Sequence, residues 1–446
     1  MVAKKTYDSG SIKELKFPLN VQKRPTMYIG SVGIEGCWHL FNEIFDNSLD
    51  EFMNDHASKI HVKIDTKNGR VSVSDDGRGI PVDNGVLEKI LCTLHMGGKF
   101  EEGAYQTSSG LNGVGASCVN ALSSEMIVEV FKDGWSYKQT FSKGVKTSEI
   151  QKIGRTNKQG TTITFVPDIE YMKLEGTKPE EWFNLEVISS NIQRRAYLCK
   201  GLYVKIEADK FKKEFCYKNG ILDYVHDTNT KPMVKDIFYA QGKDEKTKTG
   251  VEVAVGYSKG DIDQTETFCN GIYTSEGGSH LQGFRMSLST IVSQQIKDLG
   301  LITKKDNGLE IKGEDVREGI VAVVSVKVVD PLYHGQTKQK LSNPEIQGVV
   351  QRLMNEYFTE WMKANPTIAK AICMKAIAAA KARSAASAAR SRVQAQTGES
   401  SFSSINDVSK LSDCTLKDPN TTELYIVEGE QILPSLNLSN CWNTLT

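Results

Sequence analysis

Three polar residues recur at helical spacing in the segment that follows residue 35. Glu43, Asn47 and Asp50 stand at positions i, i+4 and i+7, so a helix over residues 36–55 places them in one narrow stripe. The aromatic residues of the segment fall on the opposite side, namely Trp38, Phe41, Phe45 and Phe52. The stripe fits a carboxylate base and a metal-ligating amide that face a site, and it also fits the solvated face of an amphipathic surface helix.

An acidic, glycine-containing turn comes after two expected strands at residues 61–64 and 70–74. It reads Asp75-Asp76-Gly77-Arg78-Gly79-Ile80-Pro81. Small residues directly after a strand let the backbone turn sharply and let a planar ligand approach it. A carboxylate fixed there can accept a hydrogen bond from an exocyclic amine such as that of adenine. Asp-Gly is also a common pair in ordinary turns, so this segment alone decides little.

Glycines also gather between residues 97 and 115, ahead of a helix expected from about Ala116. Gly110, Gly113 and Gly115 form a GxxGxG pattern, and the backbone N–H groups of such a loop can bind phosphates. The pattern is not a Walker A loop, because no GK[ST] ends it, and its spacing differs from the GxGxxG dinucleotide fingerprint. Taken alone, it is equally typical of a flexible surface loop.

The order of these segments, completed by Gly160-Thr161-Thr162 ahead of a strand, resembles the GHKL ATPases, which include gyrase B, MutL and the histidine kinases. The resemblance implies an α+β fold whose layered α/β domain binds ATP against a sheet, under a lid. It makes Glu43 the general base for the attacking water and Asn47 the ligand of Mg²⁺. Histidine kinases lack that base, so Glu43 favours phosphoryl transfer to water.

The resemblance also implies the nucleotide contacts. Asp75 would bind the adenine amine, directly and through a water shared with Thr161, and Gly79 would lie against the base. Lys99 and the lid at 110–115 would hold the phosphates. The expected ATP-binding residues are Asn47, Asp50, Asp75, Arg78, Gly79, Ile80, Pro81, Lys99, Tyr105, Gly110, Leu111, Asn112, Gly113, Val114, Gly115, Thr161, Gln336 and Lys338.

Further motifs narrow the resemblance to the B subunits of type IIA DNA topoisomerases, the gyrase B and topoisomerase IV B group. Gln336-Thr337-Lys338 is similar to the QTK loop of their transducer domain, where Gln336 and Lys338 would reach the γ-phosphate. Residues 274–281, TSEGGSHL, resemble the family segment TxEGGTHL. An N-terminal arm also matches, in which Tyr7 and Tyr28 would help to cover the nucleotide of the partner subunit.

Two positions depart from the family pattern. Asn112 stands where the family usually has His in the lid, and Lys138 stands where gyrase B commonly has Arg. These departures affect fine contacts to the nucleotide or to inhibitors, and they leave the expectation of ATP binding intact.

The resemblance covers residues 6 to about 430 and predicts three parts. Residues 1–222 would form the GHKL ATPase domain with its dimerisation arm, irregular to about residue 30. Residues 223–396 would form a ribosomal-S5-like transducer domain with a long C-terminal helix, and residues 397–446 a linker and a truncated TOPRIM fragment. The apolar run at 320–328 predicts a strand, and a helical stretch from Ile346 to about Val393 is expected to break near Pro366.

No acidic residue occurs between Thr367 and Gly398, whereas basic residues recur along this alanine-rich stretch. A run of one sign suggests phosphate contact without base readout, and a solvated helix paired with acids elsewhere explains it equally well. The family resemblance favours double-stranded DNA, and the expected DNA-binding residues are Lys381, Arg383, Arg390 and Arg392.

Composition limits the class of protein. Lys plus Arg and Asp plus Glu both number 55, so the formal net charge is zero and a basic surface has to be local. The nine cysteines form no CxxC pair, and neither a secretory signal nor a membrane-length apolar run is visible. We therefore expect a cytoplasmic protein with reduced thiols and no membrane contact.

The sequence as a whole predicts an ATP-binding and ATP-hydrolysing topoisomerase subunit. It would act as an ATP-gated homodimeric clamp that drives strand passage, together with an A-type subunit that carries the cleavage tyrosine. Gyrase-like and topoisomerase IV-like activities both remain compatible. Residues 423–430 resemble the opening of a TOPRIM domain, in which Glu428 would bind the Mg²⁺ used in DNA cleavage. The later DxD pair of that site is absent, so cleavage by this chain alone is not expected. The alternative is a nucleotide-gated DNA-binding or regulatory module without turnover.

Overall fold

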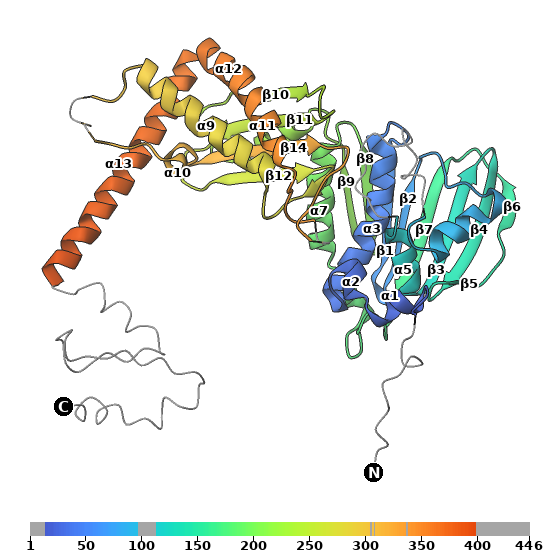
Figure 1. Cartoon of the computed structure of the whole chain (residues 1–446). Helices are drawn as coiled ribbons and strands as arrows, with labels where there is room; N and C mark the ends of the chain where they lie inside the picture. The colour runs from blue at the N-terminus through green and yellow to red at the C-terminus, as the bar shows by residue number, and fades with distance from the viewer. Residues whose placement is uncertain (1–13, 97–112, 304–305, 307, 336–337, 398–446) are drawn as a thin grey trace, which may run out of the picture. The chain divides into compact units, whose positions relative to one another are not determined.

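Two β-sheets, each with its own helices, build the α+β fold that the sequence predicts (Figure 1). The computed structural model describes residues 14–96, 113–303, 306, 308–335 and 338–397. Described residues up to Ala379 belong to one compact unit, and those from Ala380 onward belong to a second. The expected TOPRIM fragment lies outside the described residues.

The first sheet has nine strands among the described residues, in the order β5-β4-β3-β7-β2-β1-β8-β9, and β6 pairs with β4. Its strands are β1 Lys59–Asp65, β2 Arg70–Asp75, β3 Ser123–Lys132, β4 Trp135–Ser142, β5 Val145–Lys146, β6 Gln151–Arg155, β7 Gly160–Pro167, β8 Tyr203–Ala208 and β9 Phe211–Phe215. Only the pairing of β1 with β8 is parallel among those described. Because β2 and β7 are antiparallel, the end of β2 lies beside the start of β7.

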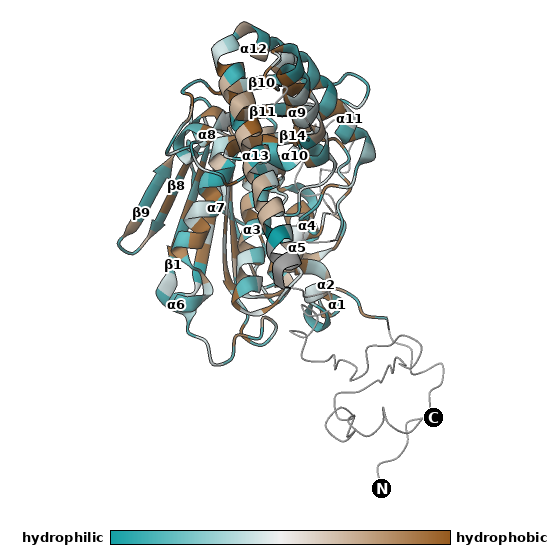
Figure 2. Ribbon diagram, turned by 90° about the vertical axis from the view of Figure 1, so that its left-hand side faces the viewer, coloured by the Kyte–Doolittle hydropathy of each residue, from teal (hydrophilic) through white to brown (hydrophobic). Residues whose placement is uncertain are grey.

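Alternation of apolar and polar residues fixes this sheet. Ile60, Val62 and Ile64 are buried on β1, and they pair with the β2 residues opposite, Val62 with Val73 and Ile64 with Val71. A shift of one residue would turn this apolar set to the other face, so the pattern specifies the register. The same alternation is visible as brown and teal segments along the strands (Figure 2).

Helices of the first half pack on this sheet. They are α1 Leu19–Lys23, α2 Thr26–Ile29, α3 Gly33–Met53, α4 Val86–Cys92, α5 Gly115–Ala121, α6 Pro179–Trp182 and α7 Leu185–Leu198, with short 3-10 turns η2 Thr66–Asn68 and η3 Asp83–Gly85. The long helix α3 contacts β1, β2 and α5, and α7 contacts β8 and β9. The predicted helix at 36–55 is confirmed as α3, and the predicted strand pair is confirmed as β1 and β2.

The expectation of an irregular segment to residue 30 is wrong for residues 19–29. Pro18 and Pro25 precede α1 and α2 at the N-cap, where a missing N–H costs no hydrogen bond. Val21 and Ile29 are buried in the first core, with 0% and 5% exposure. The prolines therefore start two short helices here and do not prevent them.

The second sheet has five strands among the described residues, in the order β10-β11-β14-β12-β13. They are β10 Phe238–Lys243, β11 Gly250–Tyr257, β12 Gln264–Cys269, β13 Ile272–Tyr273 and β14 Ile320–Lys327. The central strand β14 is buried from Ile320 to Val326, because both faces of the sheet are covered. Such burial explains its unbroken apolar sequence.

Helices on the second sheet are α8 Ile221–Thr228, α9 Ser279–Asp298, α10 Gly313–Val316, α11 Pro344–Leu353, the π-turn η6 Met354–Phe358, α12 Thr359–Ala364 and α13 Pro366–Thr397. One face packs with α9 and α11 (Figure 1). The predicted break near Pro366 is confirmed, since α12 ends at Ala364 and α13 begins at Pro366. The π-turn was not predicted, because its residues fit the surrounding helical pattern.

Stacked tyrosines join the two sheets within the larger unit. Tyr197 of α7 stacks on Tyr224 of α8, with ring centres 4.6 Å apart and planes 5° apart. Both rings belong to a small core that also contains Val321 and Val323, which lie on the second face of β14. Tyr197 also donates a 2.8 Å hydrogen bond to Asp227. An apolar stack with polar edges therefore links the half that carries α3 to the half that carries β14.

Candidate functional site

The polar stripe of α3 is covered by the fold. Phe41 and Phe45 are fully buried on the apolar side. On the stripe itself, Glu43 and Asn47 are half-buried and Asp50 is 0% exposed. A solvated surface helix does not bury a carboxylate to that extent, so the surface-helix interpretation is wrong for this face. Buried charge on one face of a helix needs specific partners.

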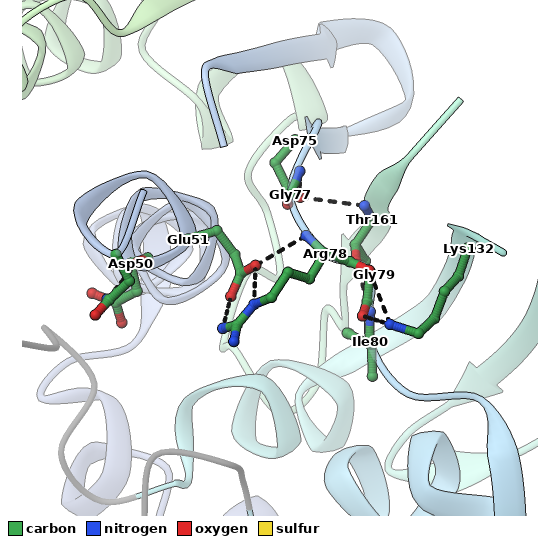
Figure 3. A network of polar contacts seen from close by, with 10 residues as sticks. Asp50, Glu51, Asp75, Gly77, Arg78, Gly79, Ile80, Lys132 and Thr161 are labelled. Atoms are coloured by element: carbon green, nitrogen blue, oxygen red, sulfur yellow. Dashed lines mark hydrogen bonds and ion pairs between the residues drawn. The ribbon is translucent and has the colours of Figure 1, made fainter. Parts of the chain in front are cut away.

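Asp75, at the end of β2, is held by donors from three segments. Ser48 Oγ of α3 donates to Asp75 Oδ2 over 2.8 Å, and the backbone N–H groups of Gly77 and Thr161 donate to Oδ1 over 3.0 and 3.3 Å. Burial raises the pKa of Asp75 to about 6, although the three hydrogen bonds lower it. Figure 3 shows Asp75 beside Gly77 and Thr161. The carboxylate therefore has a fixed position and stays ionised at neutral pH.

The turn after Asp75 folds back onto β3 and β7. Gly79 has φ of 74°, and a Cβ there would lie 3.1 Å from the Phe131 carbonyl oxygen. Ile80 N donates to Thr161 Oγ1 over 3.3 Å. Lys132 Nζ donates to the carbonyl oxygens of Arg78 and Gly79 over 3.1 and 3.4 Å (Figure 3). The turn therefore has a defined conformation against the neighbouring strands β3 and β7, as its glycines suggested.

A salt bridge ties the turn to α3. Arg78 Nη2 and Nε donate to Glu51 over 2.7 and 3.1 Å, and Arg78 N donates to Glu51 Oε2 over 3.1 Å (Figure 3). Arg78 was expected to contact ATP, and in the structure its guanidinium holds Glu51. Glu51 was not predicted. Its one signal in the sequence is its spacing of four residues from Asn47, which puts it beside the polar stripe.

Gly160 allows β7 to approach β2 closely. Its φ is 119°, and a Cβ at this position would lie 1.9 Å from the Asp75 carbonyl oxygen. The next residue, Thr161, is 7% exposed and supplies both the N–H for Asp75 and the hydroxyl for Ile80. Only glycine fits here, so the sequence Gly160-Thr161 is a geometric requirement of the site.

The start of α5 lies against Glu43. A Cβ on Gly115, the first residue of α5, would lie 2.0 Å from Glu43 Oε2. Gly113 just before it has φ of 58°, a conformation that favours glycine. The end of the predicted glycine loop therefore reaches the carboxylate at the start of the α3 stripe.

Lys338, from the second half of the protein, acts on the polar side of α3. It is half-buried in the loop after β14, and its charge acts on the Asp46 carboxyl of α3. Arg195 Nη1 of α7 lies 2.6 Å from Asp46 Oδ1. Burial raises the pKa of Asp46, and the charges of Arg195 and Lys338 oppose that rise. Asp46 and Arg195 were not predicted as site residues, because nothing in the sequence links positions so far apart.

The structure gathers most of the predicted residues that it describes. Those brought together around α3, the end of β2 and the start of β7 are Glu43, Asn47, Asp50, Asp75, Arg78, Gly79, Ile80, Gly115 and Thr161, with Lys338 near Asp46. Pro81 is exposed at the end of the turn, and Gly113 and Val114 precede α5. Predicted residues outside the described part are Tyr7, Lys99, Tyr105, Gly110, Leu111, Asn112 and Gln336.

The remaining predicted residues lie elsewhere. Tyr28 is half-buried on α2 against the first core. On α13, Lys381, Arg390 and Arg392 are exposed and Arg383 is half-buried. Lys375, on the same basic helix, instead donates to the Gly260 carbonyl oxygen over 2.8 Å, so not every cation of this run is available to a ligand.

The described residues contain no metal cluster made by the protein alone. No group of three or more His, Cys, Asp and Glu side chains among them is arranged to hold a metal ion by itself. A lone amide such as Asn47 still suits Mg²⁺, which takes few protein ligands and fills its shell with phosphate oxygens and water. Over the same part of the chain, no helix is both long and apolar enough to cross a membrane.

Comparison with known proteins decides the family. The model for histidine kinase-, DNA gyrase B- and HSP90-like ATPases matches residues 34–171, and the DNA gyrase B model matches residues 220–392. The 43K ATPase domain of Thermus thermophilus gyrase B, solved with an aminocoumarin, is 34% identical. It superposes with a TM-score of 0.68 over 83% of this chain and 97% of that one.

The chain belongs to the DNA gyrase B family. The DNA gyrase B protein of Enterococcus faecalis is 40% identical over 95% of this chain, which spans 66% of the length of that relative. The topoisomerase IV ATP-binding domain of Francisella tularensis, solved with a small-molecule inhibitor, is 28% identical. Its TM-score is 0.64, and the match covers 82% of this chain and 97% of that domain. The two halves of the fold are thus a GHKL-type ATPase domain and a gyrase B transducer domain.

Replacement of Gly160 by alanine tests the approach of β7 to β2. Since the new Cβ would meet a backbone oxygen, we expect the free energy of unfolding to fall by at least about 2 kcal/mol in urea denaturation. Gly154→Ala in β6 is the matched control, because nothing lies within 4 Å of its Cβ position and its φ is ordinary. It should change stability by less than about 0.5 kcal/mol. Equal stability of the two variants would contradict the geometry.

Proposed function

We propose that this gyrase B family chain binds ATP and Mg²⁺ beside the end of β2 and the start of β7 in its first sheet and hydrolyses ATP there. The observation that carries the proposal is the fixed Asp75 carboxylate, held by Ser48, Gly77 and Thr161 next to the buried stripe of α3. A carboxylate with three donors on it keeps lone pairs for one more planar donor. The adenine amine supplies that donor, and Gly79 leaves room for the ring.

Glu43 then acts on the water that attacks the γ-phosphate. Phosphoryl transfer needs an oriented nucleophile and neutralised charge more than covalent chemistry. Glu43 is half-buried beside Gly115, so it can orient water and accept its proton at Oε2. Asn47, one turn further along α3, would hold Mg²⁺, which when bound neutralises charge on the phosphates. Lys338 would contact the γ-phosphate as a point charge from the transducer half.

Replacement of Glu43 by glutamine tests the role of the base. The amide keeps the shape of the carboxylate but cannot take a proton, so we expect turnover to fall by about 10²- to 10⁴-fold while ATP binding changes little. Steady-state hydrolysis and calorimetric binding measure the two effects. Glu35→Gln is the matched control, since Glu35 is exposed in the first turn of the same helix. Unchanged turnover in Glu43→Gln would remove Glu43 from the mechanism.

ATP affinity should depend on the ionisation of Asp75. The pKa of Asp75 is raised to about 6, so the carboxylate that accepts from the amine is lost as pH falls through that value. We expect affinity to drop below pH 6 by up to about tenfold per pH unit in the wild-type chain. Asp75→Asn should bind weakly with no such additional drop. Titration of the ATP phosphates affects binding to the wild type and to Asp75→Asn equally, so the difference between the two pH profiles reports on Asp75. Parallel pH profiles of affinity for the two proteins would contradict this role of Asp75.

The wider activity that we propose is that of the ATP-driven clamp of a type II topoisomerase. Two copies would close on double-stranded DNA when ATP binds and reopen after hydrolysis, in the cytoplasm and together with an A-type subunit that cleaves DNA. The support is the family and the presence of both the ATPase and the transducer halves. The second candidate is a nucleotide-gated DNA-binding or regulatory module. Nucleotide binding without turnover across a concentration series would favour it.

Charge reversal on α13 tests the DNA contact. Arg383→Glu with Arg390→Glu replaces two cations on a helix that carries no acid from Pro366 to Thr397, so phosphate contact should weaken. We expect DNA stimulation of ATP turnover to be lost and basal turnover to remain. The matched control is Lys297→Glu with Lys363→Glu, which applies the same charge change at the last turns of α9 and α12. Equal loss of basal and stimulated turnover would count against DNA binding by this helix.

A further inference from the structure

One lysine of β3 holds the backbone of the turn that follows Asp75. Lys132 is the last residue of β3 and is half-buried. Its Nζ donates to the carbonyl oxygens of Arg78 and Gly79 over 3.1 and 3.4 Å (Figure 3). An ammonium group carries three N–H donors, and hydrogen bonds from a charged donor are stronger than neutral ones. Lys132 therefore holds two consecutive peptide groups of the turn.

The peptide group between Gly79 and Ile80 is held at both ends. Its carbonyl oxygen accepts from Lys132, and its N–H donates to Thr161 Oγ1 over 3.3 Å. Because a peptide group is planar, contacts at both ends fix the orientation of the whole plane. Gly79 has no side chain to cover that plane. The turn thus presents a flat backbone surface of defined orientation, and the residue that holds it on one side, Thr161, also donates to Asp75.

The turn lies directly on the ends of β3 and β7. A Cβ at Gly79 would lie 3.1 Å from the carbonyl oxygen of Phe131 and 3.3 Å from that of Gly160. Phe131 and Gly160 are themselves paired across the two strands. Gly79 contributes no side chain to this contact, so hydrogen bonds have to keep the turn in place at this point.

The carboxylate of Asp75 has supports of its own. Its three donors belong to α3, to the turn and to β7, namely Ser48, Gly77 and Thr161. Loss of the Lys132 ammonium would therefore leave the carboxylate held, and it would free the Gly79–Ile80 peptide plane at its carbonyl end. The acceptor and the flat surface of the proposed adenine site thus depend on different contacts.

We propose that Lys132 is a positioning residue that sets the selectivity of the nucleotide site for the base. The proposal rests on the proposed ATP site, in which Asp75 accepts from the adenine amine and Gly79 lies against the ring. By fixing the plane of the turn, Lys132 holds the ring where its amine meets the carboxylate. Without the ammonium the ring is held less precisely, so a base that lacks the amine is excluded less strongly.

Binding of ADP and IDP to the full chain, measured by calorimetry with Mg²⁺, tests this role. IDP differs from ADP at position 6 of the base, where a carbonyl oxygen replaces the amine, and at N1, which carries a hydrogen. Both nucleotides carry the same phosphates, so a change of charge near the site alters both affinities alike and cancels in the ratio of their dissociation constants. In Lys132→Met we expect this ratio to fall by about tenfold from its wild-type value, chiefly because ADP binds less tightly. Lys132→Arg keeps a cation with several N–H donors and should recover most of the ratio.

Lys158→Met is the matched control. Lys158 Nζ lies 5.6 Å from the centre of the Phe131 ring and donates to neither carbonyl of the turn. Its replacement removes the same charge from the same region, so the ratio should stay at the wild-type value. Lys132→Gln removes the ammonium in a second way, with a polar side chain one bond shorter, and should also lower the ratio.

Equal weakening of ADP and IDP in both Lys132→Met and Lys132→Gln would show a merely structural role and overturn the proposal. A fall of the ratio in Lys158→Met as large as in Lys132→Met would overturn it too. The wild-type chain separates this failure from failure of the proposed ATP site. If it binds ADP and IDP equally, recognition of the amine by Asp75 is wrong, and the role of Lys132 falls with it. If it prefers ADP and the Lys132 variants keep that preference, only the role of Lys132 is wrong.

Discussion

A carboxylate that is removed from water must be satisfied by hydrogen bonds, and Asp75 imposes this constraint on the whole first half of the protein. Its donors come from α3, from its own turn and from β7. The end of β2, the start of β7 and the middle of α3 therefore have to meet within hydrogen-bond distance. Gly160 makes this meeting possible, since any larger residue there would strike the backbone of Asp75. The proposed adenine pocket is a direct product of this convergence.

The two sides of helix α3 have different roles. Its apolar side fills the first core with Phe41 and Phe45, and its polar side buries Asp46 and Asp50 and half-buries Glu43. Covered like charges need cations, and the fold provides Arg195 from α7 and Lys338 from the transducer half. The tyrosine stack between α7 and α8 is the second link between the halves. The two halves are therefore linked by the packed tyrosines and by the charge of Lys338, which acts on the Asp46 carboxyl.

Helices and strands were predicted well where their apolar and polar residues follow one clear repeat along the sequence. The helical stripe located α3, the alternation located β1 and β2, and the apolar run located β14. Glu43, Asp75 and Thr161 could be proposed from the order of short motifs, because the family resemblance supplied their roles. The helices at residues 19–29 were not predicted, although Pro18 and Pro25 stand at their N-caps, where proline can start a helix.

The supporting residues could not be predicted for a different reason. Ser48 and Glu51 look like ordinary polar residues of a helix, and Arg195 lies 149 positions from Asp46, so only the folded chain shows these contacts. Lys375 belongs to the same basic run as the expected DNA-binding residues, yet the fold pairs it with the Gly260 carbonyl. Sequence patterns therefore identify residues that bind a ligand more readily than they identify contacts between residues of the protein itself.

The most direct test of the account is the affinity of the wild-type chain for ATP compared with ITP, measured by calorimetry in the same buffer with Mg²⁺. The two nucleotides differ at the 6-position of the base, where ITP carries a carbonyl oxygen in place of the amine, and at the adjacent N1, which carries a hydrogen in ITP and none in ATP. An ionised Asp75 accepts from the amine and repels the carbonyl, so ATP should bind about 100-fold or more tightly than ITP. Equal affinities would mean that Asp75 does not recognise the base, and they would contradict the proposed site at its centre.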